Sequence, residues 1–393
     1  MKWVSSFYYL PIPYGIPLAT VADQTQQVSF VNNLRGSKIR LRFSNRYSSH
    51  PLVLDKVKVN NRAVTLHGET TVRLAPFEEQ WSDELDCSVA PGDKIVVSTY
   101  IKDAQVIESA CIFWSRKGAL VKLSTSGDYT DGGDFATCNA QEIYPIVAQD
   151  ENKGMLFYGF RGLQVYTDDA VSVTAAFGDS ITHMSYVTNA LYKRLCEQYP
   201  GRAALLNCGI GGNRLLHNAT FVDTIPGNAA CFGEAGIKRF EQDVFSTEAV
   251  DTVLLLEGIN DIMHPVQFGH LDEQVRAEEL EQGYKRLIEI AHSHNARIFA
   301  ATIPPCGSPA YPADWLAQFE HTRLDLNDRI RSGIGFDGFF DYDAAVRDPH
   351  HPGYLKADCH IGDGLHPNDK GGAVMADIID LQQLLGGYTD AKR

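Results

Sequence analysis

The spacing of apolar residues changes near residue 170, and this change limits the chain to two kinds of structure joined in sequence. From about residue 25 to 165, apolar residues recur at every second position, as Ile39 and Leu41 do. Such alternation predicts half-buried β-strands, because successive side chains of a strand point to opposite faces. After residue 170, short apolar runs alternate with stretches of helical spacing. We therefore predict two domains, residues 1–165 and residues 166–393.

The first domain is predicted to be an antiparallel β-sandwich. Its alternating stretches cover residues 38–44, 52–59, 71–74 and 94–101. Turn residues separate these stretches, and none of the segments between them has a convincing helical pattern. The Ser- and Gly-rich stretch 124–134 is expected to be a loop.

The second domain is predicted to be α/β. Strands are expected over residues 171–177, 203–210, 252–256, 297–303 and 339–342, and helices over residues 186–199, 234–245, 271–293, 314–331 and 370–385. Apolar strands separated by helices indicate a parallel sheet with right-handed crossovers. In such sheets, ligands bind at the carboxyl ends of the strands.

Four polar segments follow these strands or precede the last helix. They supply a hydroxyl at Ser180, backbone amides around Gly212, a side-chain amide at Asn260, and the pair Asp363 and His366. Each has an ordinary structural explanation as a helix cap, a turn glycine, an Asx turn or a surface histidine. Together they offer a nucleophile, a base, a group that orients the base, and oxyanion donors.

In this order, the segments GDS, GIGGN, GIND and DGLHP resemble the SGNH or GDSL hydrolase superfamily over residues 171 to 390. The resemblance implies a flavodoxin-like three-layer α/β/α fold. It also implies a catalytic triad of Ser180, Asp363 and His366, and an oxyanion hole of the Ser180 amide, the Gly212 amide and the Asn260 side chain. No metal and no organic cofactor is expected.

Longer strings such as NCGIGGNRLL and DGLHPNDKGG resemble the branch of bacterial xylanase-associated arylesterases and acetyl esterases. That branch implies a jelly-roll-like N-terminal β-domain. It also implies hydrolysis of short-chain esters, acetyl esters above all, of carbohydrates or aryl alcohols. The expected substrate is therefore a small-molecule or oligosaccharide ester.

Four further side chains near these segments are candidates for substrate binding: Asp179, His183, Arg214 and Tyr311. Arg214 has an equally good alternative role as the partner of a neighbouring acid. His183 stands where the branch often has an acidic or glycine step, so the shape of the substrate pocket is not set by the resemblance.

The composition restricts partners and location. The net charge of −14 disfavours nucleic acid, which is bound by cationic surfaces. No apolar stretch is long enough to span a membrane, and the prolines near the start interrupt any leader-like run. We expect a cytoplasmic protein with no membrane partner and with reduced cysteines, since the eight cysteines show no CxxC spacing. Formation of a homo-oligomer stays open.

Two other functions compete with the esterase. The residues His350, His351, Asp358 and His360, with the Asp363–His366 pair, could form the metal site of a metal-dependent hydrolase, although their spacing matches no regular ligand motif. Alternatively, the chain could be a carbohydrate-binding protein without catalysis. The complete set of Ser, Gly, Asn, Asp and His argues against that second alternative.

Overall fold

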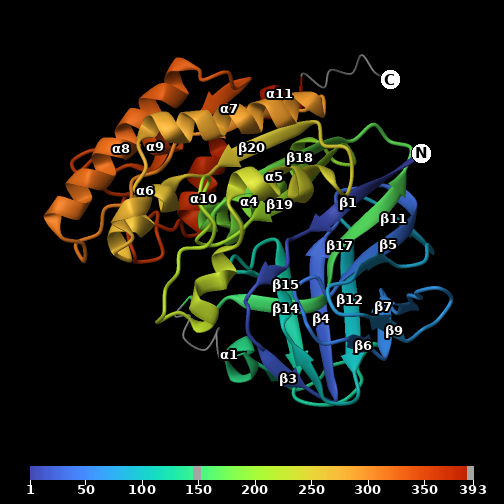
Figure 1. Ribbon diagram of the computed structural model, residues 1–393. Coiled ribbons are helices and arrows are strands. Elements are labelled where there is room, and N and C mark those ends of the chain that lie inside the picture. Colours follow the sequence, from blue (N-terminus) through green and yellow to red (C-terminus); the bar gives the residue numbers. More distant parts are fainter. Residues whose placement is uncertain (145–151, 387–393) are drawn as a thin grey trace. The chain divides into compact units, whose positions relative to one another are not determined.

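The computed structural model describes residues 1–144 and 152–386. The chain divides into two compact units (Figure 1). The first, here the strand-rich unit, consists of Met1–Val171, Cys196–Ala204 and Asp223–Cys231. The second, here the α/β unit, begins at Ser172 and takes the remaining segments. Two short segments from the later part of the chain therefore belong to the strand-rich unit.

The strand-rich unit contains two large antiparallel sheets. The seven-stranded sheet has the order β10-β5-β17-β14-β2, with β1 added to β17 and β11 to β5. Its strands are β1 (Lys2–Tyr8), β2 (Ile12–Pro13), β5 (Gly36–Ser44), β10 (Glu79–Trp81), β11 (Leu85–Val89), β14 (Ser109–Phe113) and β17 (Met155–Thr167). The six-stranded sheet has the order β16-β15-β4-β12-β7-β8. Its strands are β4 (Gln24–Val31), β7 (Lys56–Val59), β8 (Arg62–Ala63), β12 (Lys94–Ile101), β15 (Ala119–Ser124) and β16 (Thr137–Cys138).

The alternation in the sequence explains how these sheets pack. In β5, Ile39, Leu41 and Phe43 are buried, whereas the residues between them are partly exposed. Phe7 of β1 stacks on Phe30 of β4 with ring centroids 4.4 Å apart, so the two sheets face one another across an aromatic core. The unit is thus strand-rich, as predicted, and aromatic side chains of its two large sheets are in contact.

Smaller elements of this unit differ from the prediction. The stretch 52–59 forms two strands, β6 (Leu52–Leu54) and β7, because β6 leaves the large sheet to pair with β9 (Val72–Leu74). A second pair consists of β3 (Ala19–Val21) and β13 (Gln105–Ile107). One short helix, α1 (Ala140–Ile143), was not predicted.

The α/β unit is built on a five-stranded sheet of order β19-β18-β20-β21-β22. Its strands are β18 (Ser172–Gly178), β19 (Ala203–Gly209), β20 (Thr252–Leu256), β21 (Arg297–Ala301) and β22 (Gly338–Phe340). The pairs β18 with β20, β20 with β21, and β21 with β22 are parallel. Every residue of β18, β19 and β20 is buried, as expected when helices cover both faces of a sheet. The predicted α/β fold is confirmed.

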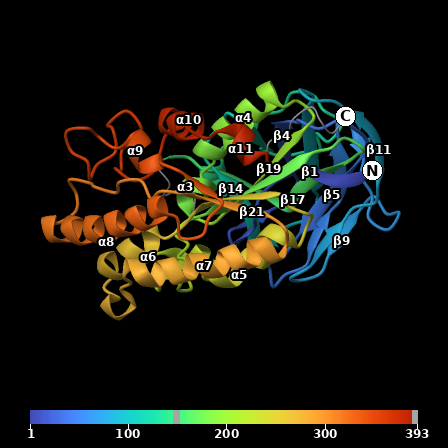
Figure 2. The ribbon, with the colours of Figure 1, turned by 90° about the horizontal axis from the view of Figure 1, so that it is seen from above.

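Helices lie on both faces of this sheet. Figure 2 shows α5, α7 and α8 on one face and α4, α10 and α11 on the other. The helices are α3 (Ser180–His183), α4 (Tyr186–Gln198), α5 (Gly236–Phe245), α6 (Ile259–Gln267), α7 (Ala277–Ser293), α8 (Ala313–Ser332), α9 (Tyr342–Val346), α10 (Asp369–Asp377) and α11 (Leu381–Leu384), with the 3₁₀ turn η2 (Leu271–Glu273). A second 3₁₀ turn, η1 (Pro226–Phe232), lies mostly in the segment Asp223–Cys231 of the strand-rich unit. Among the helices within residues 1–144 and 152–386, none is long and apolar enough to cross a membrane.

Two helix predictions need correction, and one helix of the site was missed. The helix predicted from residue 271 begins at Ala277, after the separate turn η2. The helix predicted over 370–385 is two helices, because Asp380 accepts hydrogen bonds from the Gln382 and Gln383 N–H groups and so begins α11. Helix α6, which contains Asn260, was not predicted at all.

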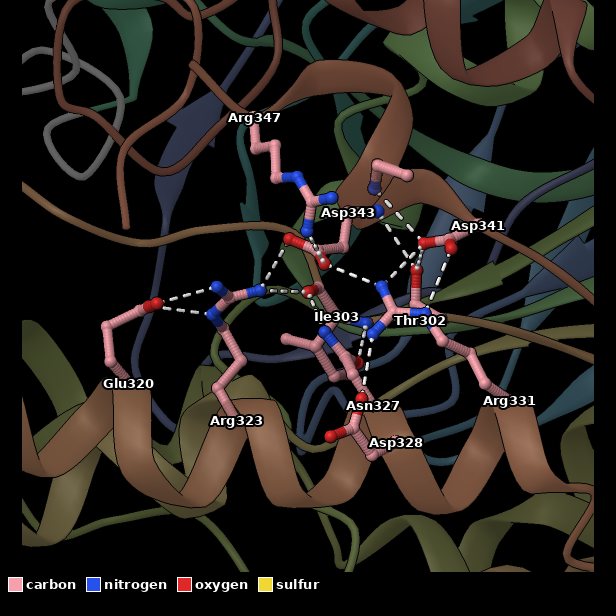
Figure 3. A network of polar contacts seen from close by, with 11 residues as sticks. Thr302, Ile303, Glu320, Arg323, Asn327, Asp328, Arg331, Asp341, Asp343 and Arg347 are labelled. Carbon is pink, nitrogen blue, oxygen red and sulfur yellow. Dashed lines mark hydrogen bonds and ion pairs between the residues drawn. The ribbon is translucent and has the colours of Figure 1, made fainter. Parts of the chain in front are cut away.

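A buried ionic network fixes α8 to the end of β21 (Figure 3). Arg323 binds Glu320 with two N–H groups at 2.7 Å each, and donates to Asp343 at 2.8 Å and to the Ile303 carbonyl at 2.9 Å. Arg331 and Arg347 bind the other oxygen of Asp343. Asn327 both donates to the Ile303 carbonyl and accepts from its N–H. This Arg323 network thereby satisfies the buried polar groups where β21 ends.

Candidate active site

Ser180, His366 and Asp363 form a continuous chain of hydrogen bonds. The Ser180 Oγ lies 2.7 Å from Nε2 of His366, and Nδ1 of His366 lies 2.6 Å from Oδ2 of Asp363. With the proton on Nδ1 donated to the carboxylate, Nε2 is free to accept the serine proton. This is the geometry that a nucleophile, a general base and an orienting carboxylate require.

The position of Ser180 follows from the way β18 ends. Asp179 leaves the strand in an extended conformation, and its Oδ1 accepts a hydrogen bond from the Ile181 N–H at 2.9 Å. This N-cap starts α3 at Ser180, so the hydroxyl stands at the carboxyl end of a central strand. Only 9% of Ser180 is exposed, which keeps the hydroxyl largely out of bulk water.

The turn before α10 holds the other two members. Oδ1 of Asp363 accepts hydrogen bonds from the N–H groups of Leu365 and His366, both at 3.0 Å. Partial burial would raise the pKa of Asp363, but the hydrogen bond and charge of His366 and these two N–H groups outweigh it and lower the pKa to about 2. Asp363 is therefore a carboxylate at every physiological pH.

His360 shapes the same turn. Its Nδ1 accepts hydrogen bonds from the N–H groups of Gly362 and Gly364, each at 3.1 Å. Both glycines have positive φ, 120° and 79°, which a side chain would strain. The turn that presents Asp363 and His366 is thus fixed by the His360 imidazole and by two glycines whose φ angles are positive.

The loop after β19 lies against Ser180. A Cβ built on Gly211 would be 3.9 Å from the Ser180 Cβ, so this loop borders the nucleophile. Gly212 has a φ of 73°, and a Cβ there would come within 2.0 Å of the Phe232 ring, so only glycine fits. Within the part of the chain that the structure describes, neither the Ser180 N–H nor the Gly212 N–H donates a hydrogen bond to a protein acceptor. Both amides are available to a developing oxyanion.

Asn260 is connected to this loop. It lies in the first turn of α6, and only 4% of it is exposed. The helix begins directly after Gly258, whose φ is 120°. Its Nδ2 donates to the carbonyl of Asn213 at 2.8 Å, which leaves its second N–H for another acceptor. The structure therefore brings the predicted donors Gly212 and Asn260 to one loop beside Ser180.

The candidate substrate-binding residues Asp179 and His183 are both buried. Besides capping α3, Asp179 has a second carboxyl oxygen with no hydrogen bond of normal geometry among the described residues. Burial raises the pKa of Asp179 to about 7, because the Ile181 N–H and the charges of His366 and Arg239 offset it only in part. Nδ1 of His183 accepts a hydrogen bond from the Gly211 N–H at 2.9 Å, so His183 supports the oxyanion loop.

Arg214 and Tyr311 occupy different surroundings. Arg214 is 2% exposed, pairs with Glu273 at 2.6 Å and donates to the Asn218 carbonyl, which favours the alternative of a partner for a neighbouring acid. Tyr311 is half-buried and close enough to Asp363 for the carboxylate charge to raise its pKa, although burial is the main cause of that rise. Contact with substrate stays a prediction for all four candidates.

Several residues of the site were not predicted from the sequence. Phe232 covers Gly212, and its ring stands 5.0 Å from that of His264, which in turn lies 5.1 Å from Phe268. Burial, and then the charge of Arg214, lower the pKa of His264 to about 3, so this imidazole is neutral and belongs to an aromatic wall. Arg239 of α5, described below, was also missed.

The histidine cluster near the C-terminus does not form a metal site. Across the described residues, no group of three or more His, Cys, Asp or Glu side chains is close enough together to hold a metal ion. Asp358 pairs with Lys370, and His360 is occupied with the glycines of the catalytic turn. The imidazole ring of His351 packs against Tyr354. Within residues 1–144 and 152–386, the alternative of a metal-dependent hydrolase therefore finds no ligand set.

Comparisons with known proteins identify the family. The sequence model of the GDSL-like lipase/acylhydrolase family matches residues 176–374, slightly more than half of the chain. The comparison with curated protein sequences finds no match.

Solved structures give more distant likenesses. LAE5, an alpha/beta hydrolase enzyme from the metagenome of Lake Arreo, Spain, is 22% identical, with 56% of this chain and 99% of that chain covered and a TM-score of 0.40. The acetyl xylan esterase AlAXEase is 21% identical, with coverages of 52% and 96% and a TM-score of 0.39. A catalytic mutant of an acetylxylan esterase from Geobacillus stearothermophilus is 17% identical, with coverages of 56% and 96% and a TM-score of 0.41. The family match and the α/β fold together identify the chain: it belongs to the GDSL-like lipase/acylhydrolase family and is a carboxylic ester hydrolase.

Proposed function

We propose that this ester hydrolase cleaves short-chain carboxylic esters, acetyl esters above all, of carbohydrates or aryl alcohols through an acyl-enzyme on Ser180. The observation that carries the proposal is the hydrogen-bonded chain from Ser180 through His366 to Asp363. A hydroxyl that shares a proton with an oriented imidazole is an activated nucleophile.

The reaction would proceed in two halves. His366 takes the Ser180 proton as Oγ bonds to the ester carbonyl carbon, and the carbonyl oxygen becomes an oxyanion held by the amides of Ser180 and Gly212 and by Asn260. The tetrahedral intermediate collapses as His366 returns the proton to the leaving alcohol. A water molecule, deprotonated by His366, then attacks the acyl-enzyme. The bond between Oγ and the acyl carbon breaks as His366 returns this proton to the Ser180 Oγ, and the free acid leaves.

Crowding beside the nucleophile supports a small acyl group. The loop residue Gly211 stands against both Ser180 and the buried His183, and Phe232 closes the space over Gly212. Phe232 in turn packs in a row with His264 and Phe268, so an acyl chain that extended past Gly212 would meet this wall. Hydrophobic walls of this kind discriminate by fit, typically by about 1–3 kcal/mol for each methylene.

A carbohydrate or aryl alcohol is supported by a second group of residues. Tyr311 and Trp315 are half-buried, with ring centroids 6.3 Å apart, and the charge of the catalytic Asp363 contributes to the raised pKa of Tyr311, after burial as the main cause. Faces of aromatic side chains bind sugars and aryl groups. The resemblance to xylanase-associated arylesterases and acetyl esterases points in the same direction.

The test combines labelling with a substrate series. We expect a fluorophosphonate probe to label the wild-type protein on Ser180, and Ser180→Ala to lose both labelling and activity. Esters of p-nitrophenol from acetyl to octanoyl, run beside acetylated xylan and acetylated monosaccharides, should show the highest kcat/KM for acetyl. Full activity of Ser180→Ala would refute the nucleophile, and a maximum at octanoyl would refute the small acyl pocket.

Two controls separate the other functions. Activity should survive prolonged incubation with a strong chelator, since the proposed mechanism uses no metal. A protein that binds xylan but hydrolyses none of these esters would support the carbohydrate-binding alternative instead.

A further inference from the structure

A buried arginine on α5 lies beneath the loops that form the candidate site. Arg239 is 4% exposed, and its guanidinium stacks over the ring of Phe177 with 4.0 Å between the guanidinium carbon and the ring centroid. The same guanidinium donates to the carbonyl of Gly178 and to the carbonyl of Cys208, both at 2.9 Å. One side chain therefore joins the end of β18, two residues before Ser180, to the end of β19.

The third bond of Arg239 reaches the oxyanion loop. Its Nε donates to Oδ1 of Asn213 at 2.7 Å. The side-chain nitrogen of Asn213 donates to the carbonyls of Phe232 and Glu234. The backbone carbonyl of Asn213 accepts the bond from the Asn260 side chain. Asn213 is fully buried, so each of these groups depends on its protein partner.

All three proposed oxyanion donors are thus close to Arg239 along covalent or hydrogen bonds. The Ser180 amide is two residues after the Gly178 carbonyl that Arg239 binds. The Gly212 amide is one residue before Asn213, and the Asn260 amide is held by the carbonyl of Asn213. A shift of the guanidinium would therefore disturb the spacing between the Ser180 segment and the loop that carries Gly212 and holds Asn260.

The charges around Arg239 differ from those of a simple ion pair. Asp243 lies 3.2 Å and Glu257 3.6 Å from its nitrogen atoms. Both carboxylate oxygens of Glu257 are buried and have no hydrogen bond of normal geometry within residues 1–144 and 152–386. Burial, and then the charge of Asp179, hold the pKa of Glu257 well above its usual range. The shortest bonds of Arg239 therefore go to the loops of the site, whereas Asp243 accepts a longer bond from it at 3.2 Å. Of these two acids, Glu257 is the one left without a hydrogen bond of normal geometry among the described residues.

We propose that Arg239 is a positioning residue that sets the spacing of the oxyanion donors around Ser180. The inference rests on the proposed function, in which Ser180 is the nucleophile. Donors fixed in advance stabilise the transition state more than the bound substrate. Loosening them by even 1 Å can lower a rate by about a hundredfold. Arg239 should therefore act on kcat and leave KM nearly unchanged.

The test replaces Arg239 by lysine. Lysine keeps the positive charge beside Asp243 and Glu257 but cannot reach three separated acceptors with one planar group. We expect Arg239→Lys to lower kcat about 10- to 100-fold with KM within about twofold. Its affinity for an alkyl boronic acid, which mimics the tetrahedral intermediate, should fall by the same factor as kcat/KM.

The matched control is Arg323→Lys, which alters an equally buried arginine of the same unit. Arg323 binds the Ile303 carbonyl and two acids, and none of its partners carries an oxyanion donor. We expect this variant to lose stability but to keep kcat, KM and boronic acid affinity per labelled active site.

A second variant tests the same positioning role if Arg239→Lys does not fold. Asn213→Ala removes the side-chain oxygen that the Arg239 Nε binds, and the side-chain amide that binds the Phe232 and Glu234 carbonyls. The bonds of Arg239 to the carbonyls of Gly178 and Cys208 stay in place. Asn213→Ala should lower kcat and boronic acid affinity together. The double variant Arg239→Lys, Asn213→Ala should lower kcat by less than the product of the two single reductions, because both changes act on the same hydrogen bonds.

The outcomes are distinct. A folded Arg239→Lys protein with unchanged kcat and boronic acid affinity, or with a raised KM and normal kcat, would overturn the positioning role. If the wild-type protein itself is not labelled on Ser180, the proposed function fails first. Labelling of the wild type together with an unaffected variant would overturn this inference alone.

Discussion

Two buried arginines of the α/β unit are equally hidden from water but differ in their surroundings. Arg323 binds Glu320 with two N–H groups and shares Asp343 with two other arginines. Three cations and three buried or half-buried acids therefore balance in this network (Figure 3): Arg323, Arg331 and Arg347 with Glu320, Asp341 and Asp343. Arg239 stands among Asp179, Asp243 and Glu257, and two of these acids have oxygens without a normal hydrogen bond in the described part of the chain.

The difference indicates what each network does. Saturated buried ion pairs hold helices in place, and breaking one leaves an uncompensated charge. Polar groups left unsatisfied in a protein core cost stability, and such costs are commonly concentrated at functional sites. We therefore expect changes around Arg323 to act on stability, and changes around Arg239 to act on the reaction. Four predictions test that division, from the largest effect to the smallest.

Replacement of Arg323 by methionine should cause the largest change. It removes the guanidinium that binds one oxygen of the fully buried Asp343 and both oxygens of Glu320, so we expect a loss of about 3–5 kcal/mol in the free energy of unfolding. Urea denaturation followed by circular dichroism measures the loss. The kcat per labelled active site should stay unchanged, and a loss below about 1 kcal/mol would show that the network adds little to stability.

Removal of the Asn260 amide should affect the reaction more than the fold. One missing oxyanion donor costs about 100- to 1,000-fold in kcat. Asn327→Ala is the matched control, because Asn327 is also a buried asparagine whose amide donates to a backbone carbonyl, in its case that of Ile303. Stopped-flow or steady-state hydrolysis of p-nitrophenyl acetate measures both variants. Equal kcat values for the two variants would contradict the view that the surroundings of Arg239 serve the reaction and those of Arg323 serve stability.

Asp179→Asn should make the protein more stable in neutral and alkaline solution. The pKa of Asp179 is raised to about 7 by burial, so the ionised form is disfavoured in the folded state. The resulting penalty is absent below about pH 4, grows between about pH 4 and 7, and is complete above pH 7. Asparagine keeps the N-cap on the Ile181 N–H and removes the charge.

We expect Asp179→Asn to gain about 2 kcal/mol at pH 8 and nothing at pH 3.5, measured by thermal unfolding across that range. Asp341→Asn in the Arg323 network has the opposite expectation, because Arg331 and nearby donors lower the pKa of Asp341 despite its burial. It should lose stability at pH 8. A gain at pH 8 for both variants would erase the contrast between the networks.

Arg347→Ala should have the smallest effect. Its side chain is 41% exposed, and its bond to Asp343 duplicates the bonds that Arg331 and Arg323 make. Exposed ion pairs contribute about 1 kcal/mol or less. A loss in urea denaturation as large as that of Arg323→Met would mean that Asp343 needs all three arginines.

The sequence was sufficient for elements whose pattern is local. Strands β12 and β20 have the bounds that alternation and apolar runs predict. The spacing of Asp363 and His366 in a glycine-rich turn, and the position of Ser180 at a strand end, led to the three residues that the structure joins by hydrogen bonds. Each of these signals lies within a few neighbouring residues.

Features that depend on distant contacts were not predictable. Arg239 stands in an amphipathic helix beside Phe240 and Val244, and nothing in that segment shows that its charge is buried under loops from β18 and β19. The same holds for Phe232, whose contact with Gly212 crosses a long irregular segment. The break between α10 and α11 was the exception, because Asp380 is a recognisable N-cap.

The hydrogen bond between Ser180 and His366 joins residues 186 positions apart. Contacts of such long range form late in folding, because the intervening chain must first be ordered. The serine should therefore regain its reactivity only when the whole α/β unit has assembled. During refolding from urea, the rate at which Ser180 becomes reactive toward a fluorophosphonate would then measure the rate of the last folding step.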